Sequence, residues 1–157
     1  MNRIRKGILF IFFLKLTACN FGAGSYSYAE TYELNYSEEV IKKAINEFKL
    51  DNPDFLVPKT TIKNQGSYDL IDEQLKEPSY WYSFYFYYKN ENKILLTLVR
   101  SVSQGKSLIA FVSINAGLDL GHWKDINKDF SSSEDKQEKK IFEERILNRL
   151  KEKLNKK

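Results

Sequence analysis

Apolar side chains recur at helical spacing in two segments near the two ends of the polar part of the chain. Residues 38–49 and 134–154 both carry apolar positions three or four residues apart, which predicts an amphipathic helix over each segment. Ser37 and Ser133 precede these segments and suit the N-cap position. Each helix has an apolar face that must pack against another element. The apolar positions are Val40, Ile41, Ala44, Ile45 and Phe48 in the first helix, and Ile141, Phe142, Ile146, Leu147, Leu150 and Leu154 in the second.

Between the two predicted helices, runs of aromatic and β-branched residues alternate with short polar turns. Residues 80–88, 94–102 and 107–114 form three such runs. Consecutive strands joined by short turns predict an antiparallel meander. Residues 55–63 suggest a further strand, which Pro58 limits to a sheet edge because proline cannot donate to the ladder.

The order of these elements predicts an α+β fold, in which a three- to four-stranded antiparallel meander packs with an N-terminal and a C-terminal amphipathic helix. Residues 68–76 fit either a short helix or a strand and leave the strand count open. Residues 117–133 contain two glycines and three consecutive serines, and we expect a loop there.

The first residues of the chain have a different pattern. Residues 2–6 contain three basic side chains, and an apolar run of eight residues follows at 7–14. A basic segment followed by a short apolar one is typical of a secretory signal peptide. A membrane-spanning helix needs about 20 apolar residues, whereas this run ends at Lys15. We therefore expect that the protein is exported.

The distribution of charge agrees with export. The chain has 25 Lys+Arg against 21 Asp+Glu, a formal net charge of +4. Arg3, Arg5, Lys6 and Lys15 all precede the first acid, Glu30, and the rest of the chain has 21 bases against 21 acids. An exported body without net charge argues against nucleic acid as the partner. The aromatic content of 15% argues against a disordered chain.

A cysteine closely follows the apolar run. Leu16-Thr17-Ala18-Cys19 resembles the lipobox of bacterial lipoproteins, and the Lys-, Asn- and Ile-rich body is similar in composition to spirochaetal surface lipoproteins. The resemblance implies cleavage after Ala18 and lipid attachment to Cys19, the only cysteine of the chain. Lys15 departs from the family pattern, which prefers an apolar residue at that position.

A second processing site competes with the lipobox. Ser27-Tyr28-Ala29 has the small-x-Ala pattern of a signal-peptidase site, and cleavage after Ala29 would release a soluble, secreted protein starting at Glu30. With the lipobox, the chain divides into a signal peptide at 1–18, a lipidated tether at 19–35 and one α+β domain at 36–157. Two acyl chains already anchor a protein stably. We expect the protein in the cell envelope, anchored to the outer membrane or cell surface or to a periplasmic membrane face.

The run at 80–88 carries an aromatic side chain at nearly every position. Side chains alternate between the two faces of a strand, and we expect the even-numbered residues to face the core: Tyr80, Tyr82, Phe84, Phe86 and Tyr88. The other face carries Trp81, Tyr85 and Tyr87. These three residues and Trp123 are candidate partner-binding residues, because Tyr and Trp combine a large rigid ring with a hydrogen-bonding tip. The alternative is that the second helix covers this face.

Other candidate sites have weaker patterns. His122, the only histidine, lies in the 117–130 loop without a nucleophile motif elsewhere in the chain. Asp125, Asn127 and Asp129 are spaced like the start of a calcium loop, but Phe130 occupies the position where such a loop needs glycine. We expect no metal and no cofactor. The basic residues at the C-terminus are expected to form a solvated helix end.

These observations predict a membrane-anchored bacterial envelope lipoprotein that acts as a non-catalytic interaction module. Its partner would be a protein or a glycan of a host, of the envelope or of a toxin. Two alternatives stay open. One is a small exported enzyme with a site around His122, and the other is a structural envelope subunit whose aromatic rows are buried.

Overall fold

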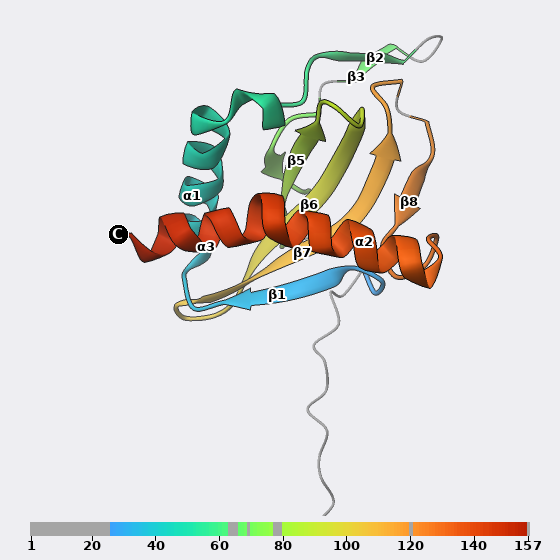
Figure 1. Ribbon diagram of the computed structural model, residues 1–157. Coiled ribbons are helices and arrows are strands. Elements are labelled where there is room, and N and C mark those ends of the chain that lie inside the picture. Colours follow the sequence, from blue (N-terminus) through green and yellow to red (C-terminus); the bar gives the residue numbers. More distant parts are fainter. Residues whose placement is uncertain (1–25, 63–65, 69, 77–79, 120, 157) are drawn as a thin grey trace, which may run out of the picture.

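The computed structural model describes residues 26–62, 66–68, 70–76, 80–119 and 121–156, and in it helices pack on one side of an antiparallel sheet (Figure 1). The predicted signal peptide, with Ala18 and Cys19, lies outside the described residues. The elements in chain order are β1 (Glu30–Leu34), α1 (Glu38–Asp51), the 3₁₀ turn η1 (Pro53–Phe55), β2 (Thr60–Ile62), β3 (Gly66–Tyr68), β4 (Glu73–Gln74), β5 (Tyr82–Tyr88), β6 (Lys93–Ser103), β7 (Lys106–Ala116), β8 (Trp123–Asp125), α2 (Ser132–Phe142), the π-helical segment η2 (Glu143–Leu147) and α3 (Asn148–Asn155).

The predicted meander is present as β5, β6 and β7, which pair in sequence order. A tight turn joins β6 to β7, with Gly105 at φ +73°, a left-handed conformation that glycine adopts without strain. β4 extends the sheet beyond β5. β1 and β8 share the other edge of β7, because β1 pairs with residues 107–111 and β8 with residues 113–115. Within the described residues this sheet has six strands, so the α+β class is confirmed but the predicted three to four strands were too few.

Two strands of the sheet were not recognised from the sequence. β1 lies inside the predicted tether at 19–35, and β8 lies inside the predicted loop at 117–133. Both are short and largely polar, so that their alternation of buried and exposed positions is not distinctive by itself. The prediction of a tether up to residue 35 is therefore wrong for β1, which belongs to the folded domain.

In the described part of the chain, little regular structure is present in residues 55–63, predicted as an edge strand, and in residues 68–76, predicted as either a helix or a strand. After η1 the chain forms β2, which pairs only with β3 among the described residues, in a ribbon separate from the main sheet. The predicted strand at 55–63 is thus limited to β2. Between residues 68 and 76 the described part contains the end of β3 and the two-residue β4, and it contains no helix.

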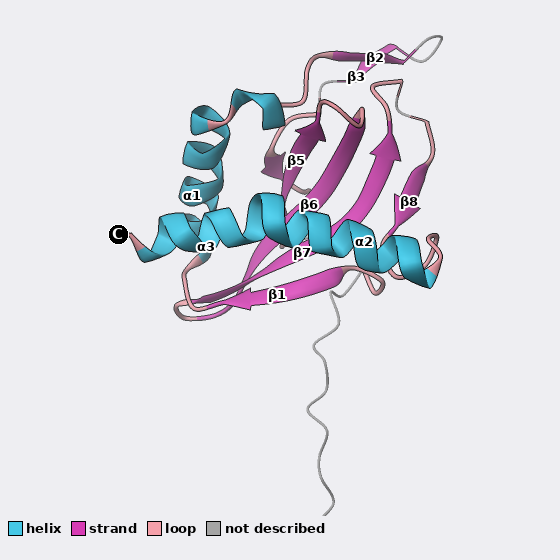
Figure 2. Cartoon of the chain, viewed as in Figure 1, coloured by secondary structure: helices cyan, strands magenta, loops and turns pink. Residues whose placement is uncertain are grey.

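Both predicted helices pack on the same face of the sheet (Figure 2). The apolar faces of α1 and of the C-terminal helix meet strands β1, β5, β6 and β7 in the main core. Phe84, Phe86 and Tyr88 of β5 are buried in it as expected, whereas Tyr80 is 80% exposed and takes no part in it. Tyr80 precedes β5, so the alternation that holds within the strand does not extend to it.

The C-terminal helix begins two residues earlier than predicted. Ser131, and not Ser133, is its N-cap: the Ser131 Oγ accepts from the Glu134 backbone N–H at 3.4 Å, and Glu134 accepts in return from the Ser131 N–H at 3.0 Å. This reciprocal arrangement is a capping box. The helix then continues through α2, η2 and α3 without interruption. At the first helix Ser37 is at the N-cap position of α1, as predicted, but its side chain makes no capping hydrogen bond.

Candidate functional site

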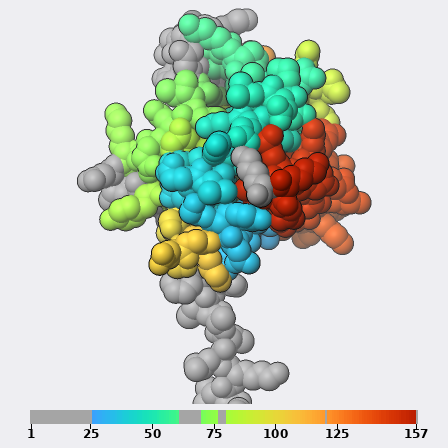
Figure 3. Space-filling view, turned by 90° about the vertical axis from the view of Figure 1, so that its left-hand side faces the viewer, coloured from blue at the N-terminus to red at the C-terminus, as the bar shows by residue number. Residues whose placement is uncertain are grey.

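The face of the sheet opposite the helices has a small apolar cluster of its own. Trp81, Leu98, Leu108, Ala110 and Val112 are buried there, and Tyr26, Ala29, Leu75 and Leu96 pack against them. Figure 3 shows the two sides, with the C-terminal helix in red on one side of β1 (blue) and the green segment around residues 70–85 on the other. No helix of the described chain covers this face, which we call the open face.

At one end of the open face lies Trp81, which is 3% exposed. The Arg100 guanidinium lies 4.6 Å from the centre of the Trp81 ring, within the range of cation–π contacts. The Tyr26 ring meets Trp81 edge-on, with the ring centres 6.3 Å apart and the planes at 89°. Trp81 therefore supports this face from within and does not present its ring to a partner.

The other candidate residues lie further along the same face. Tyr85 of β5 and Trp123 of β8 lean towards each other, with ring centres 6.3 Å apart at 56°, and both are half-buried. Tyr87 is also half-buried, and its hydroxyl donates to Asn92 Oδ1 at 2.9 Å. Burial raises the pKa of Tyr85, with smaller contributions from Glu73, Tyr26 and Asp72. The fold thus places Tyr85, Tyr87 and Trp123 on one surface, although they come from two non-adjacent strands.

Tyr26 is a residue of this surface that sequence analysis did not assign to it. Residues 26–29 form a turn in which the Ala29 N–H donates to the Tyr26 carbonyl at 3.0 Å. The turn brings Tyr26 back over the open face, next to Trp81. The regular recurrence of tyrosines through residues 26–36 was the available signal, but only the turn determines which face each one meets.

A shallow hollow of about 210 Å³ lies beside this turn, lined by residues 26–29, Val112 and Asp125. Small-molecule sites have volumes of roughly 300–1,000 Å³ and are largely closed. The hollow is smaller than that range and open to solvent, so this part of the open face has the form of a contact surface.

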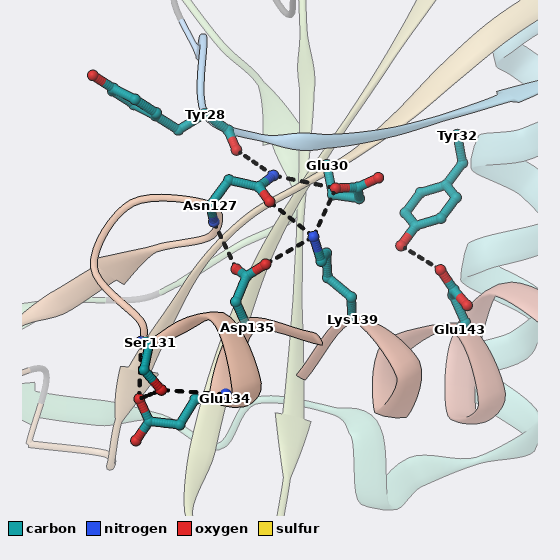
Figure 4. A network of polar contacts seen from close by, with 9 residues as sticks. All are labelled: Tyr28, Glu30, Tyr32, Asn127, Ser131, Glu134, Asp135, Lys139 and Glu143. Carbon is teal, nitrogen blue, oxygen red and sulfur yellow. Dashed lines mark hydrogen bonds and ion pairs between the residues drawn. The ribbon is translucent and has the colours of Figure 1, made fainter. Parts of the chain in front are cut away.

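A polar network fixes the chain where it enters β1 (Figure 4). Asn127 lies in the turn after β8 with a left-handed φ of +61°, which asparagine tolerates better than most residues. Its Nδ2 donates to the Tyr28 carbonyl at 2.9 Å and to Glu30 Oε2 at 3.2 Å, while its backbone N–H donates to Asp135 Oδ1 at 2.7 Å.

Lys139 of α2 is the centre of this network. Its Nζ lies 2.8 Å from Asn127 Oδ1, 2.7 Å from Asp135 Oδ2 and 3.2 Å from Glu30 Oε2. Further along the helix, the Tyr32 hydroxyl donates to Glu143 Oε1 at 3.0 Å, and burial together with that carboxylate raises the pKa of Tyr32. These contacts bind the start of β1 to the C-terminal helix and fix the position of residues 28–30 on the domain.

A buried ion pair lies at the opposite edge of the sheet. The Lys49 ammonium, at the end of α1, contacts Asp72 and donates to the Tyr85 carbonyl at 2.7 Å. Asp72 Oδ1 also accepts from the Tyr85 N–H at 2.9 Å, so the pair satisfies the backbone of β5 just before β4 begins. Burial lowers the pKa of Lys49, and Asp72 opposes this effect. The sequence pattern did not indicate this pair, because its two residues are far apart in sequence.

The alternative site around His122 lies in the segment that contains β8 and the turn after it. His122 is exposed. Asp129 Oδ2 accepts from the Asp125 N–H at 2.8 Å, and Lys128 pairs with Asp125 at 3.1 Å, so both acids stabilise the turn. Among the described residues, no group of three or more His, Cys, Asp or Glu side chains is placed to hold a metal ion.

Two basic residues of the C-terminal helix contact α1. Lys153 pairs with Asp51 at 2.7 Å and with Glu47 at 3.7 Å. Arg149 lies 5.0 Å from the centre of the Phe48 ring. Arg149, Lys151 and Lys156 are exposed, in agreement with the predicted solvated helix end.

Comparison with known proteins adds no relative: no protein-family model, no curated protein and no solved structure matches this chain. In the described part of the chain, no helix has both the length and the apolar character needed to cross a bilayer.

Proposed function

We propose that this protein is a bacterial envelope lipoprotein, anchored to a membrane through lipid on Cys19, whose domain binds a partner through the open face without catalysis. The observation that supports this proposal is the arrangement of the layers. All the described helices pack on one face of the sheet, and the other face keeps half-buried aromatic residues from separate strands, Tyr85, Tyr87 and Trp123. Such residues are enriched at the centres of interfaces.

The anchor is tested by the intact mass of the protein isolated from the membrane fraction of its native host. A mature chain starting at Cys19 and carrying acyl groups is the expected result. An unmodified chain starting at Glu30 contradicts the anchor and identifies the rival site after Ala29 as the one used. The variant Cys19→Ala is the matched control, and it should lose the acyl groups.

The binding surface is tested by oxidative labelling of aromatic side chains. In the purified chain beginning at Asn20, we expect labelling of Tyr85 and Trp123, since both are half-buried. In intact cells the partner should protect both residues. Tyr80, which is 80% exposed and precedes β5, is the internal control and should be labelled equally in both preparations. Equal labelling of Tyr85 and Trp123 in both preparations contradicts a partner on the open face.

A further inference from the structure

We propose that the partner of the open face is the interfacial region of the lipid bilayer that holds the anchor, so that the domain lies with this face on its own membrane. This inference rests on the proposed lipid attachment to Cys19. The other candidate partners, a protein or a glycan, are treated as outcomes of the test.

The length of the tether is the first argument. Tyr26 follows Cys19 by seven residues, and a fully extended chain spans at most about 3.6 Å per residue, or about 25 Å over this distance. Tyr26 itself packs on the open face. A lipid on Cys19 therefore holds the bilayer surface within about 25 Å of this face, a distance comparable to the thickness of the domain.

The fixed attachment point is the second argument. Asn127 holds the Tyr28 carbonyl and the Glu30 carboxylate, and Lys139 also pairs with Glu30. Because these contacts join the start of β1 to α2 (Figure 4), the domain cannot turn freely about residues 28–30. The tether is consequently joined to the domain at one fixed position, next to the open face.

The chemistry of the face is the third argument. Trp123 lies on this face beside Tyr85, whereas Trp81 is buried beneath it. Trp123, Tyr85 and Tyr87 are half-buried, and Trp and Tyr concentrate at membrane–water interfaces because their rings are apolar and their tips polar.

The charges at the rim of this face are compatible with a lipid surface. Glu33 pairs with Lys106 at 3.0 Å and Asp125 with Lys128 at 3.1 Å, so a cation accompanies each of these acids. Arg100 lies over Trp81 and adds a further positive charge. Anionic headgroups attract basic side chains near the surface, so Arg100 favours this contact, whereas Glu73, whose charge acts on the neighbouring Tyr85, opposes it.

The test uses a single tryptophan as the reporter in each variant. The lipidated full-length chain, processed in a bacterial host, is inserted into vesicles of phosphatidylcholine and phosphatidylglycerol whose acyl chains carry bromine close to the headgroups. In the Trp81→Phe variant, Trp123 is the only tryptophan. We expect its emission to be less intense in brominated vesicles than in unbrominated ones. In both kinds of vesicle the emission should lie at shorter wavelength than that of the protein without vesicles.

A matched reporter on the helix layer gives the control. Leu50 lies on α1 and is 77% exposed. In the variant Trp81→Phe/Trp123→Phe/Leu50→Trp, the new tryptophan lies on the side of the domain opposite to the open face. We expect no loss of its emission in brominated vesicles. Equal quenching at positions 50 and 123 overturns the proposed orientation.

Vesicle flotation separates this inference from the proposed function. If the protein floats with the vesicles but Trp123 keeps its emission, the anchor stands and the bilayer contact is wrong. If Trp123 keeps its emission in brominated vesicles but is protected from labelling in intact cells, the partner is a protein or a glycan. That result overturns the bilayer assignment. A processed protein that does not float contradicts the anchor, and this inference fails with it.

Discussion

At the scale of single residues, two polar groups take part in contacts that determine the local structure. Lys49 is 5% exposed, and its ammonium is held between Asp72 and the backbone of β5. Asn127 holds a left-handed turn and at the same time binds the segment that enters β1. In both cases a residue type that is usually found on the surface joins chain segments that are distant in sequence.

The Lys49–Asp72 pair predicts an asymmetric response to substitution. Asp72→Ala leaves a buried ammonium without its counter-ion and should lower the free energy of unfolding by about 3 kcal/mol. Lys49→Met should cost less, because the Asp72 carboxylate is 21% exposed and can be solvated. Urea denaturation of both variants and of the double variant measures the difference. Equal losses for the two single variants contradict the assignment of Lys49 as the more deeply buried partner.

Two substitutions of Asn127 separate the effect of backbone strain on stability from the effect of the side-chain hydrogen bonds. Asn127→Gly removes the bonds to Tyr28 and Glu30 but keeps the left-handed φ accessible, whereas Asn127→Ala also forces a Cβ into that conformation. We expect Asn127→Ala to be less stable than Asn127→Gly by about 1 kcal/mol, the cost of the left-handed region for a residue with a Cβ. Thermal unfolding of the two variants compares them. An alanine variant as stable as the glycine variant contradicts strain at this position.

At the scale of elements, the spacing of the buried apolar residues in the C-terminal helix accounts for its π-helical segment η2. Phe142, Ile146, Leu150 and Leu154 follow one another at intervals of four residues and are all buried. In an α-helix with 3.6 residues per turn, such a series drifts around the helix axis. The wider turn of η2 offsets this drift, as expected for a π-helical segment. Within η2, Arg145 lies 4.9 Å from the centre of the Tyr88 ring and pairs with Glu91 at 2.7 Å.

The start of this helix provides a matched pair of serines. Ser131→Ala removes the N-cap and should lower the free energy of unfolding by about 1 kcal/mol. Ser133→Ala, two residues later, should leave stability nearly unchanged. Thermal or urea unfolding of both variants tests the assignment, and a larger loss for Ser133→Ala contradicts it.

The capping box also predicts a dependence on pH. Its bonds to Ser131 lower the pKa of Glu134 below its ordinary value of 4.5 in the folded protein. A depressed carboxyl pKa stabilises the fold above the unfolded pKa, and this contribution is lost as the pH falls through the folded value. The difference in stability between the natural chain and Glu134→Gln should therefore shrink below about pH 4. A difference that is constant from pH 7 to pH 3 contradicts an ionic role for Glu134.

At the scale of the whole molecule, the sheet has two unequal sides. The helix-covered side contains the main core, and the open side has the smaller cluster around Trp81 that Tyr26 and Leu75 help to cover. The segment before β1 is therefore part of the domain, although it is only a few residues long. Its contacts link the place of the proposed anchor to the orientation of the domain.

The two predicted processing sites should consequently give domains of different stability. A chain beginning at Asn20 keeps Tyr26 on Trp81 and the bond from Asn127 to Tyr28, whereas a chain beginning at Glu30 loses both. We expect the shorter chain to be less stable by about 2 kcal/mol, since part of the apolar cluster becomes exposed. The emission of Trp81, measured in the Trp123→Phe background, should shift to longer wavelength. Identical spectra for the two chains contradict the contact between Tyr26 and Trp81.

The sequence by itself determined the elements whose pattern is local. The two amphipathic helices, the meander β5–β6–β7 and the inward side of β5 follow from periodicity and turn residues, because each depends on neighbours a few positions apart. The export signal and the lipobox are also local patterns, and they stay predictions. The three candidates Tyr85, Tyr87 and Trp123 were found from residue type, and the fold places them on one surface.

Tertiary structure alone decided which side of the sheet the helices cover and how the short segments join it. Periodicity gives each helix an apolar face but does not say which face of the sheet that helix will meet. β1 and β8 become strands because β7 offers them a paired edge, and Trp81 is buried because Arg100 and Tyr26 reach it from other elements. Burial is a property of the assembled chain: it depends on residues brought together across long sequence separations, which no local pattern encodes.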